Sequence, residues 1–195
     1  MLNNTDDQNA DKAAGMEADP LHPRGQLVQT HLIEIFKEKY RIPLITSSIL
    51  SVIVAVLLRN AVDWNLLAGW LVVLNISNFA RLIYFARIAG RPSDHGNLLY
   101  FANRYTIAVA LNGLLWGLAG VLFFPPDMPE YQVFLAFVIG GLAAGAAANC
   151  AAWMPAFYAH TVPSVVPLAI RFMTEGREVS VAMGIILLLF TMAVY

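Results

Sequence analysis

The chain has 195 residues, of which 58% are hydrophobic and 13% are charged, and its formal net charge at pH 7 is -1. Soluble domains are typically about half apolar and about a quarter charged, so the apolar excess predicts burial in lipid. The near-neutral charge provides no basic surface for nucleic acid, which proteins bind through many phosphate contacts. The single cysteine, Cys150, excludes an intramolecular disulfide and a four-cysteine metal site.

The N-terminal part of the sequence divides into a polar tail and an amphipathic segment. Residues 1–23 are polar and acidic and lack the basic start and apolar run of a signal peptide, so we expect a disordered cytoplasmic tail. In residues 24–41, apolar side chains recur at helical spacing. This pattern predicts an amphipathic helix that lies in the headgroup plane; the alternative is that the segment is the cytoplasmic end of the first span.

Six apolar segments follow, with lengths close to the roughly 20 residues of a membrane-spanning helix. Polar or proline-containing turns separate them, for example residues 60–63 and 125–127. The expected fold class is therefore all-α, a polytopic membrane helix bundle of about six transmembrane helices preceded by the amphipathic helix. It forms one domain over residues 42–195, with spans at residues 43–58, 64–85, 100–124, 131–151, 155–172 and 179–195.

Basic residues near the ends of the spans predict the orientation, because cytoplasmic loops retain positive charge. With the N-terminus inside, eight basic residues lie on the cytoplasmic side and three lie on the other side. We therefore expect both termini in the cytoplasm. The last span reaches Tyr195 without a basic flank, so we also expect the chain to be part of a longer protein.

Glycines spaced four residues apart mark two helix faces. Gly113 and Gly117 form one such pair in the third span, and Gly141 and Gly145 form another in the fourth. Small residues at this spacing let neighbouring backbones approach closely in lipid. Both pairs predict helix packing, either within one subunit or across a dimer contact.

The fifth span combines prolines with a histidine. Pro163 and Pro167 each remove a backbone donor and predict a kink with unbonded carbonyl groups. A histidine at membrane depth is costly unless it faces the bundle interior. His160, with Ser164 one turn further along the same face, is therefore the first candidate for binding a ligand, a proton or a metal. The alternative is a histidine that only forms a hydrogen bond to a neighbouring helix.

Asparagines in the second and third spans predict a polar interior. Asn75 and Asn78 share a face of the second span, and Asn112 and Trp116 lie about a turn apart in the third. Polar groups in hydrocarbon need partners, so these residues are expected to line a ligand pocket or to join helices by hydrogen bonds, and we favour the second interpretation. Arg81 is expected to extend to the inner headgroups, or otherwise to pair inside the bundle.

Sequence motifs of common enzyme sites are absent. There is no phosphate-binding loop, zinc-protease motif or nucleophile elbow, and no two histidines have metal-ligand spacing. We therefore predict no catalytic residue, metal or cofactor. No acidic residue lies within a span, which argues against an ion-coupled transporter.

Features from the third span onward suggest a family. They are Trp116-Gly117, Phe124-Pro125, Gln132, the glycine- and alanine-rich residues 140–148, and Pro155, Pro163 and Pro167. In these features the chain resembles the MASE-type integral-membrane sensory domains that precede GGDEF diguanylate cyclase or histidine kinase modules in bacterial signalling proteins. The resemblance covers most of residues 24–195. It implies a homodimeric six-helix input domain in the bacterial inner membrane, whose sixth helix leads to a cytoplasmic output module.

The first functional hypothesis is a domain for signal sensing and dimerisation. A small apolar signal molecule would reach the second to fifth helices from the outer leaflet or periplasm and change the position of the sixth. Expected partners are membrane lipid, a second copy of the chain and this molecule, but not nucleic acid. The alternatives are a small transporter or channel subunit, and a structural anchor that dimerises an output domain and binds nothing.

Overall fold

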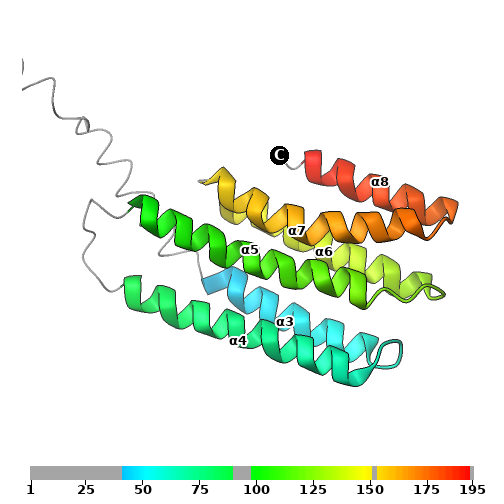
Figure 1. Ribbon diagram of the computed structural model, residues 1–195, viewed down its shortest axis with the longest axis horizontal. Coiled ribbons are helices and arrows are strands. Elements are labelled where there is room, and N and C mark those ends of the chain that lie inside the picture. The colour runs from blue at the N-terminus through cyan, green and yellow to red at the C-terminus, as the bar shows by residue number, and fades with distance from the viewer. Residues whose placement is uncertain (1–40, 90–97, 151–152, 194–195) are drawn as a thin grey trace, which may run out of the picture.

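In the computed structural model, residues 41–89, 98–150 and 153–193 are described, and their regular structure is entirely helical. The helices run up and down in an elongated bundle (Figure 1). They are α3 (Arg41–Leu58), α4 (Trp64–Ala89), α5 (Leu98–Leu122), α6 (Pro129–Cys150), α7 (Met154–Thr174) and α8 (Glu178–Ala193). Each of the six apolar segments thus forms a helix, which confirms the all-α class for this part of the chain. The expected acidic tail and nearly all of the amphipathic segment lie outside the described residues.

Four of these helices are long and apolar enough to cross a membrane, namely α3, α4, α5 and α6. Helix α7 has 21 residues, but His160, Arg171 and its internal prolines reduce its apolar character. Helix α8 is apolar but has only 16 residues, fewer than the roughly 20 that span a bilayer. The prediction of several membrane spans is therefore confirmed by length and composition for α3 to α6, and it stays a prediction for α7 and α8.

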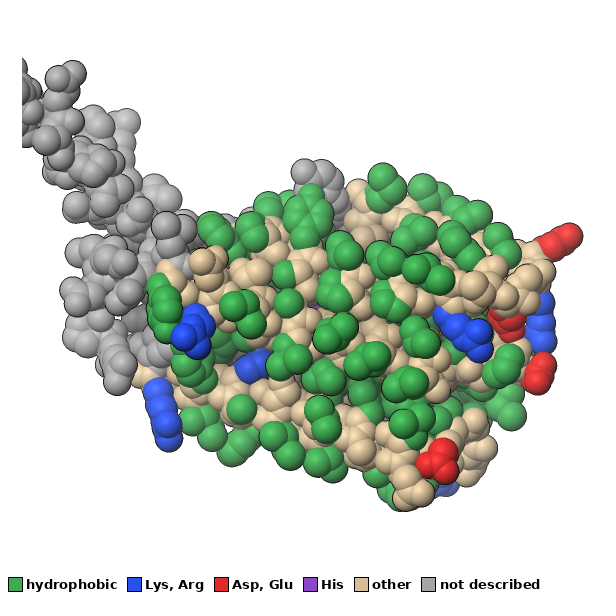
Figure 2. All heavy atoms as spheres, in the orientation of Figure 1, with side chains coloured by type: hydrophobic (Ala, Val, Ile, Leu, Met, Phe, Trp, Pro, Cys, Tyr) green, Lys and Arg blue, Asp and Glu red, His purple; other side chains and the backbone are tan. Residues whose placement is uncertain are grey.

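Hydrophobic side chains cover the sides of the bundle, whereas charged side chains gather towards its ends (Figure 2). Large apolar residues are exposed on all six helices, and the exposed fraction of Phe137 reaches 80%. Contiguous apolar surface of this extent marks a surface that faces lipid or another protein. Together with the four long apolar helices, it gives the chain the character of a multi-pass membrane protein.

The two ends of the bundle differ in charge. The end at which α3 begins carries arginines and, among the described residues, no acidic side chain; its arginines are Arg41, Arg81, Arg87 and Arg104. The opposite end, here called the far end, carries Arg59, Arg171 and Arg177 together with Asp63, Asp127, Glu130, Glu175 and Glu178. Every described carboxylate side chain is therefore distant from the end at which α3 begins.

Helix α7 packs most extensively against α5, and glycines make this contact close. A Cβ atom added at Gly113 would overlap the carbonyl oxygen of His160, and one added at Gly117 would overlap that of Pro163. Pro167 has no N–H group for the Pro163 carbonyl, so the backbone of Gly117 covers an oxygen that lacks its helical partner. Gly113 and Gly117 thus bring two backbones together within one chain.

The glycine pair of α6 has a different environment. A Cβ atom added at Gly141 or Gly145 would meet no atom within 4 Å. Among the described residues, the close helix contact that this pair suggested is therefore not formed, because the space beside both glycines is open. The alternative of a dimer contact at Gly141 and Gly145 stays a prediction.

Hydrogen bonds join the turns at the far end. The side-chain amide of Gln132 donates to the Pro125 carbonyl at 2.8 Å and to Oε1 of Glu175 at 2.8 Å. Ser180 donates to Oε2 of Glu175 at 2.7 Å. Gly176, between Glu175 and α8, has a φ of 77°, a conformation that glycine adopts without steric cost. This network holds the α5–α6 turn, the start of α6 and the α7–α8 turn together.

The Glu175 carboxylate makes the stability of this network dependent on pH. Burial opposes its ionisation, but the hydrogen bonds from Ser180 and Gln132 and the nearby Arg177 and Arg171 outweigh burial and lower the pKa of Glu175 below 4.5. A pKa lowered on folding stabilises the folded state above the unfolded pKa, and this contribution is lost as the pH falls through the folded pKa. We therefore expect the thermal stability of the chain in detergent to fall as the pH is lowered below 4.5.

The variant Glu175→Gln tests this dependence, because it removes the charge and retains an amide oxygen for Ser180. Its melting temperature should change less than that of the wild type over the same pH range. Glu178→Gln, an exposed change at the start of α8, serves as the control and should keep the acid-induced loss. An equal acid-induced loss in Glu175→Gln and the wild type would contradict the role of the Glu175 carboxylate.

Candidate ligand-binding cavity

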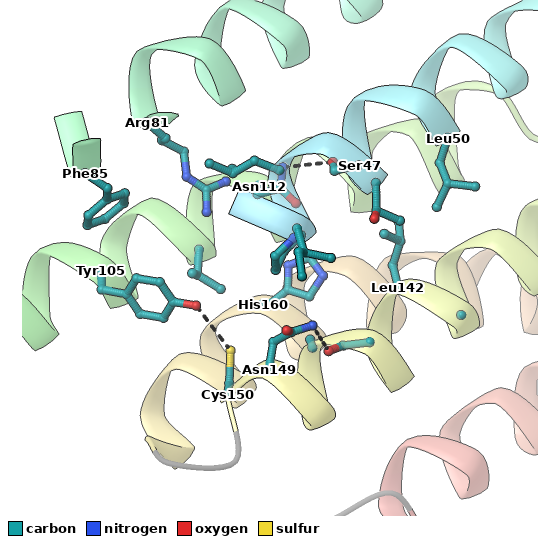
Figure 3. Close-up of a pocket in the computed structure, with 18 residues that line it drawn as sticks. Ser47, Leu50, Arg81, Phe85, Tyr105, Asn112, Leu142, Asn149, Cys150 and His160 are labelled. Atoms are coloured by element: carbon teal, nitrogen blue, oxygen red, sulfur yellow. Dashed lines mark hydrogen bonds between the residues drawn. The ribbon is translucent and has the colours of Figure 1, made fainter. Parts of the chain in front are cut away.

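A cavity of about 250 Å³ lies among helices α3 to α7, in the half of the bundle where α3 begins (Figure 3). Hydrophobic side chains form much of its wall, including Leu44, Leu50, Phe85, Val109 and Leu142. The Tyr105 ring packs edge-on against Phe85, with 5.7 Å between the ring centroids. The cavity is therefore an apolar space inside the bundle.

Exposed residues on two helices mark the mouth of the cavity. Ile42 and Thr46 of α3 line it and are exposed, as are Gly141 and Gly145 of α6. Because these residues lie on facing helices, the cavity opens sideways between α3 and α6. Within the described part of the chain, no side chain fills the space beside the two glycines.

One wall of the cavity is a hydrogen-bond network centred on Ser47. Its Oγ accepts hydrogen bonds from Trp116 Nε1 at 3.0 Å and from Asn112 Nδ2 at 3.3 Å. Asn112 also donates to Oδ1 of Asn78 at 3.0 Å, and Asn78 donates to Ser48 Oγ at 3.1 Å. These side chains join α3, α4 and α5 and satisfy buried polar groups, as polar residues in hydrocarbon require.

The structure separates the six predicted ligand-binding residues into three groups. Asn112 and His160 line the cavity, and Asn78 and Trp116 lie directly behind its wall in the Ser47 network. The other two lie elsewhere. Asn75 donates to Ser51 Oγ at 3.1 Å and to the Leu71 carbonyl at 2.8 Å. Ser164 is fully buried and donates to the Thr161 carbonyl at 3.1 Å.

His160 extends from α7 into the middle of the cavity (Figure 3). Its side chain is buried, and its Nδ1 atom has no hydrogen-bond partner among the described residues. A buried polar atom without a partner is costly, so most such atoms in proteins are satisfied by protein or by a bound molecule. The imidazole therefore offers an unused hydrogen-bonding position to a ligand.

Arg81 is the principal cavity residue that the sequence did not identify. Its guanidinium reaches from α4 towards Asn112 and His160 (Figure 3), which favours the alternative that Arg81 lies inside the bundle over the expectation that it extends to the headgroups. Its Nε and Nη1 atoms are buried and have no hydrogen-bond partner among the described residues. The available signal was its position, since Asn78, Arg81 and Phe85 follow one another at steps of three and four on one helical face.

Cys150 and Tyr105 also belong to the polar part of the lining, together with Thr46 and Asn149. The Tyr105 hydroxyl lies 3.8 Å from the Cys150 sulfur, and both side chains are buried. Within residues 41–89, 98–150 and 153–193, no three His, Cys, Asp or Glu side chains converge as metal ligands. The cavity thus presents a guanidinium, an imidazole, amides, hydroxyls and a thiol in a largely apolar wall, which suits an organic ligand better than a metal ion.

Comparisons of the chain with protein-family models, with curated proteins and with solved structures find no match. The cavity residues therefore carry the functional interpretation. Five helices contribute to one internal space, and two of its polar side chains have buried nitrogen atoms without partners. A concave apolar site with a few convergent polar groups is typical of small-molecule binding.

Proposed function

We propose that this chain is the signal-sensing and dimerisation domain of a bacterial inner-membrane protein, and that a small molecule bound in the cavity controls a cytoplasmic output module after Tyr195. By the resemblance to MASE-type domains, that module is a diguanylate cyclase or a histidine kinase. The observation that carries the proposal is the cavity itself, into which Arg81 and His160 present unpartnered nitrogen atoms. An anchor that binds nothing has no need of such a site.

Helix packing provides a route from the cavity to the last helix. His160 lies on α7, which also packs closely against α8. A Cβ atom added at Gly184 of α8 would lie 3.0 Å from the carbonyl oxygen of Ala169 on α7. A movement of α7 therefore displaces α8. A ligand that binds two arrangements of α7 with different affinity would shift the population between them.

The charge asymmetry supports an orientation with the α3 start at the cytoplasmic side. That end carries four described arginines and no described acidic residue, as expected for a cytoplasmic face. In this orientation the cavity lies in the cytoplasmic half of the bundle. The ligand then reaches it from the inner leaflet through the mouth between α3 and α6, rather than from the outer leaflet or periplasm.

The experiment begins with the gene downstream of the Tyr195 codon, which identifies the output module. Output activity of the full-length protein is then compared for the wild type, Gly145→Leu and Gly69→Leu in membranes from cells grown in rich and minimal media. A leucine at Gly145 adds a side chain at the mouth of the cavity, where an added Cβ atom would meet no atom within 4 Å. Because allosteric coupling is typically worth about 5- to 150-fold, we expect Gly145→Leu to change output about fivefold or more in at least one medium.

Gly69→Leu is the matched control, since Gly69 is exposed on α4, has open space beside it and does not line the cavity. It should leave output unchanged. Wild-type output from Gly145→Leu in both media would contradict sensing through this cavity. A stop codon after Tyr195, together with solute uptake by the purified chain in liposomes, would favour the transporter alternative.

A further inference from the structure

The cavity contains a positive charge without a described counter-charge. Arginine stays protonated in proteins, so the Arg81 guanidinium carries its charge into the bundle. Its Nε and Nη1 atoms are buried without partners, and every described carboxylate side chain lies at the far end. Buried charges in proteins are normally paired, and the planar guanidinium matches a carboxylate in two parallel hydrogen bonds. The unused atoms of Arg81 therefore suit an anionic group that comes from a ligand.

The rest of the cavity suits an alkyl chain. Leu44, Phe85 and Val109 form an apolar wall near Arg81, and His160 presents its unpartnered Nδ1 to the same space. A dry cavity of roughly 150 Å³ holds benzene, so a cavity of about 250 Å³ holds roughly ten non-hydrogen atoms. A single chain of medium length fits this volume, whereas a phospholipid with two acyl chains exceeds it. The sideways mouth between α3 and α6 allows a longer tail to continue into lipid.

We propose that the cavity binds a single-chain carboxylate of the fatty-acid class. This inference rests on the proposed function and specifies the chemical class of the sensed ligand. The carboxylate pairs with Arg81, and it accepts a hydrogen bond from His160 Nδ1 when that nitrogen carries the proton of the imidazole. The alkyl chain of the ligand lies against the apolar side chains of α3, α4 and α5. A lipid phosphate has the same attraction for a guanidinium, so the test distinguishes the two anions.

The protein contains a residue, Cys150, that can report whether a ligand occupies the cavity. Cys150 is the only cysteine in the sequence and lines the cavity, so its alkylation by a small maleimide reports access to this space. The purified chain in nanodiscs of zwitterionic lipid is treated with octanoate, 1-octanol or octyl phosphate, which share one alkyl chain. Mass spectrometry then gives the alkylation rate. We expect octanoate to slow the reaction at concentrations about 10- to 100-fold lower than octanol, because hydrogen bonds to a charged group add to chain burial.

Two arginine variants test the assignment to Arg81. Arg81→Gln should lose the preference for octanoate over octanol and keep the binding of octanol. Arg87→Gln, an exposed change on the same helix, should keep the wild-type preference. Unliganded alkylation rates and melting temperatures of both variants serve as the check on folding, and the three probes on the wild type remain decisive if Arg81→Gln does not fold.

The proposal is overturned if octanoate protects wild-type Cys150 from alkylation no better than octanol does. Pairing of Arg81 with another part of the protein would give this same result. It is overturned as well if Arg81→Gln keeps the preference. Stronger protection by octyl phosphate than by octanoate would assign the site to a lipid headgroup instead. These outcomes do not depend on the output activity of Gly145→Leu. The proposal of a fatty-acid ligand can therefore be refuted while the proposed sensing function is retained.

Discussion

Replacing Gly117 by alanine is expected to destabilise the bundle by about 1–3 kcal/mol, the usual cost of overpacking a close contact. The added methyl group would overlap the carbonyl oxygen of Pro163 on α7. Both sides of this contact are backbone, so no side-chain rotation relieves it and the helices must separate. The expected result is a lower midpoint of unfolding for Gly117→Ala, measured by denaturant titration of the purified chain in detergent micelles.

Gly69→Ala is the matched control, because it makes the same change inside a helix where the added methyl group meets nothing within 4 Å. Alanine exceeds glycine in helix propensity by about 1 kcal/mol, so this variant should be as stable as the wild type or slightly more stable. If Gly117→Ala unfolds at the same midpoint as Gly69→Ala, α5 and α7 do not approach each other as closely as the structure has them.

The helices were predictable from the sequence because their signal is local. Apolar runs bounded by proline and polar turns place each helix without knowledge of its neighbours, and the turn at Pro125-Pro126-Asp127 does separate α5 from α6. The end of α4 was less predictable. That helix continues to Ala89, beyond the expected end at Phe85, because the residues between them include no proline or glycine.

The cavity was not predictable from the sequence, because it depends on the rotation of each helix about its own axis, which decides the face that packs against each neighbour. Gly113-Gly117 and Gly141-Gly145 are identical patterns, yet the first pair packs against α7 and the second lies beside open space. Ser47 is the acceptor for the predicted Asn112 and Trp116, but a single serine in an apolar run gives no signal of its own. Sequence spacing defines the polar face of one helix, whereas the partner across the bundle follows from tertiary packing.

Substituting Arg81 by methionine is expected to stabilise the unliganded domain by about 1–3 kcal/mol, the usual cost of leaving a buried donor unsatisfied. Methionine is flexible and apolar, replaces the aliphatic part of the arginine side chain and has no charge to desolvate. The buried Nε and Nη1 atoms of Arg81 have no described partner, so little is lost when they are removed. The measurement is the midpoint of unfolding of the purified chain in lipid-free detergent without added ligand.

The same substitution should remove the stabilisation that octanoate gives to the wild type. A ligand that binds only the folded state raises stability with its free concentration, so the wild type should gain stability with octanoate while Arg81→Met gains no more than it does with octanol. Arg87→Met, on the exposed face of α4, should match the wild type to within about 0.5 kcal/mol in both conditions. A loss of stability in unliganded Arg81→Met would mean that Arg81 already has a partner in the chain. Stabilisation of the empty domain combined with loss of the octanoate response is the pattern of a residue retained for binding at the expense of stability.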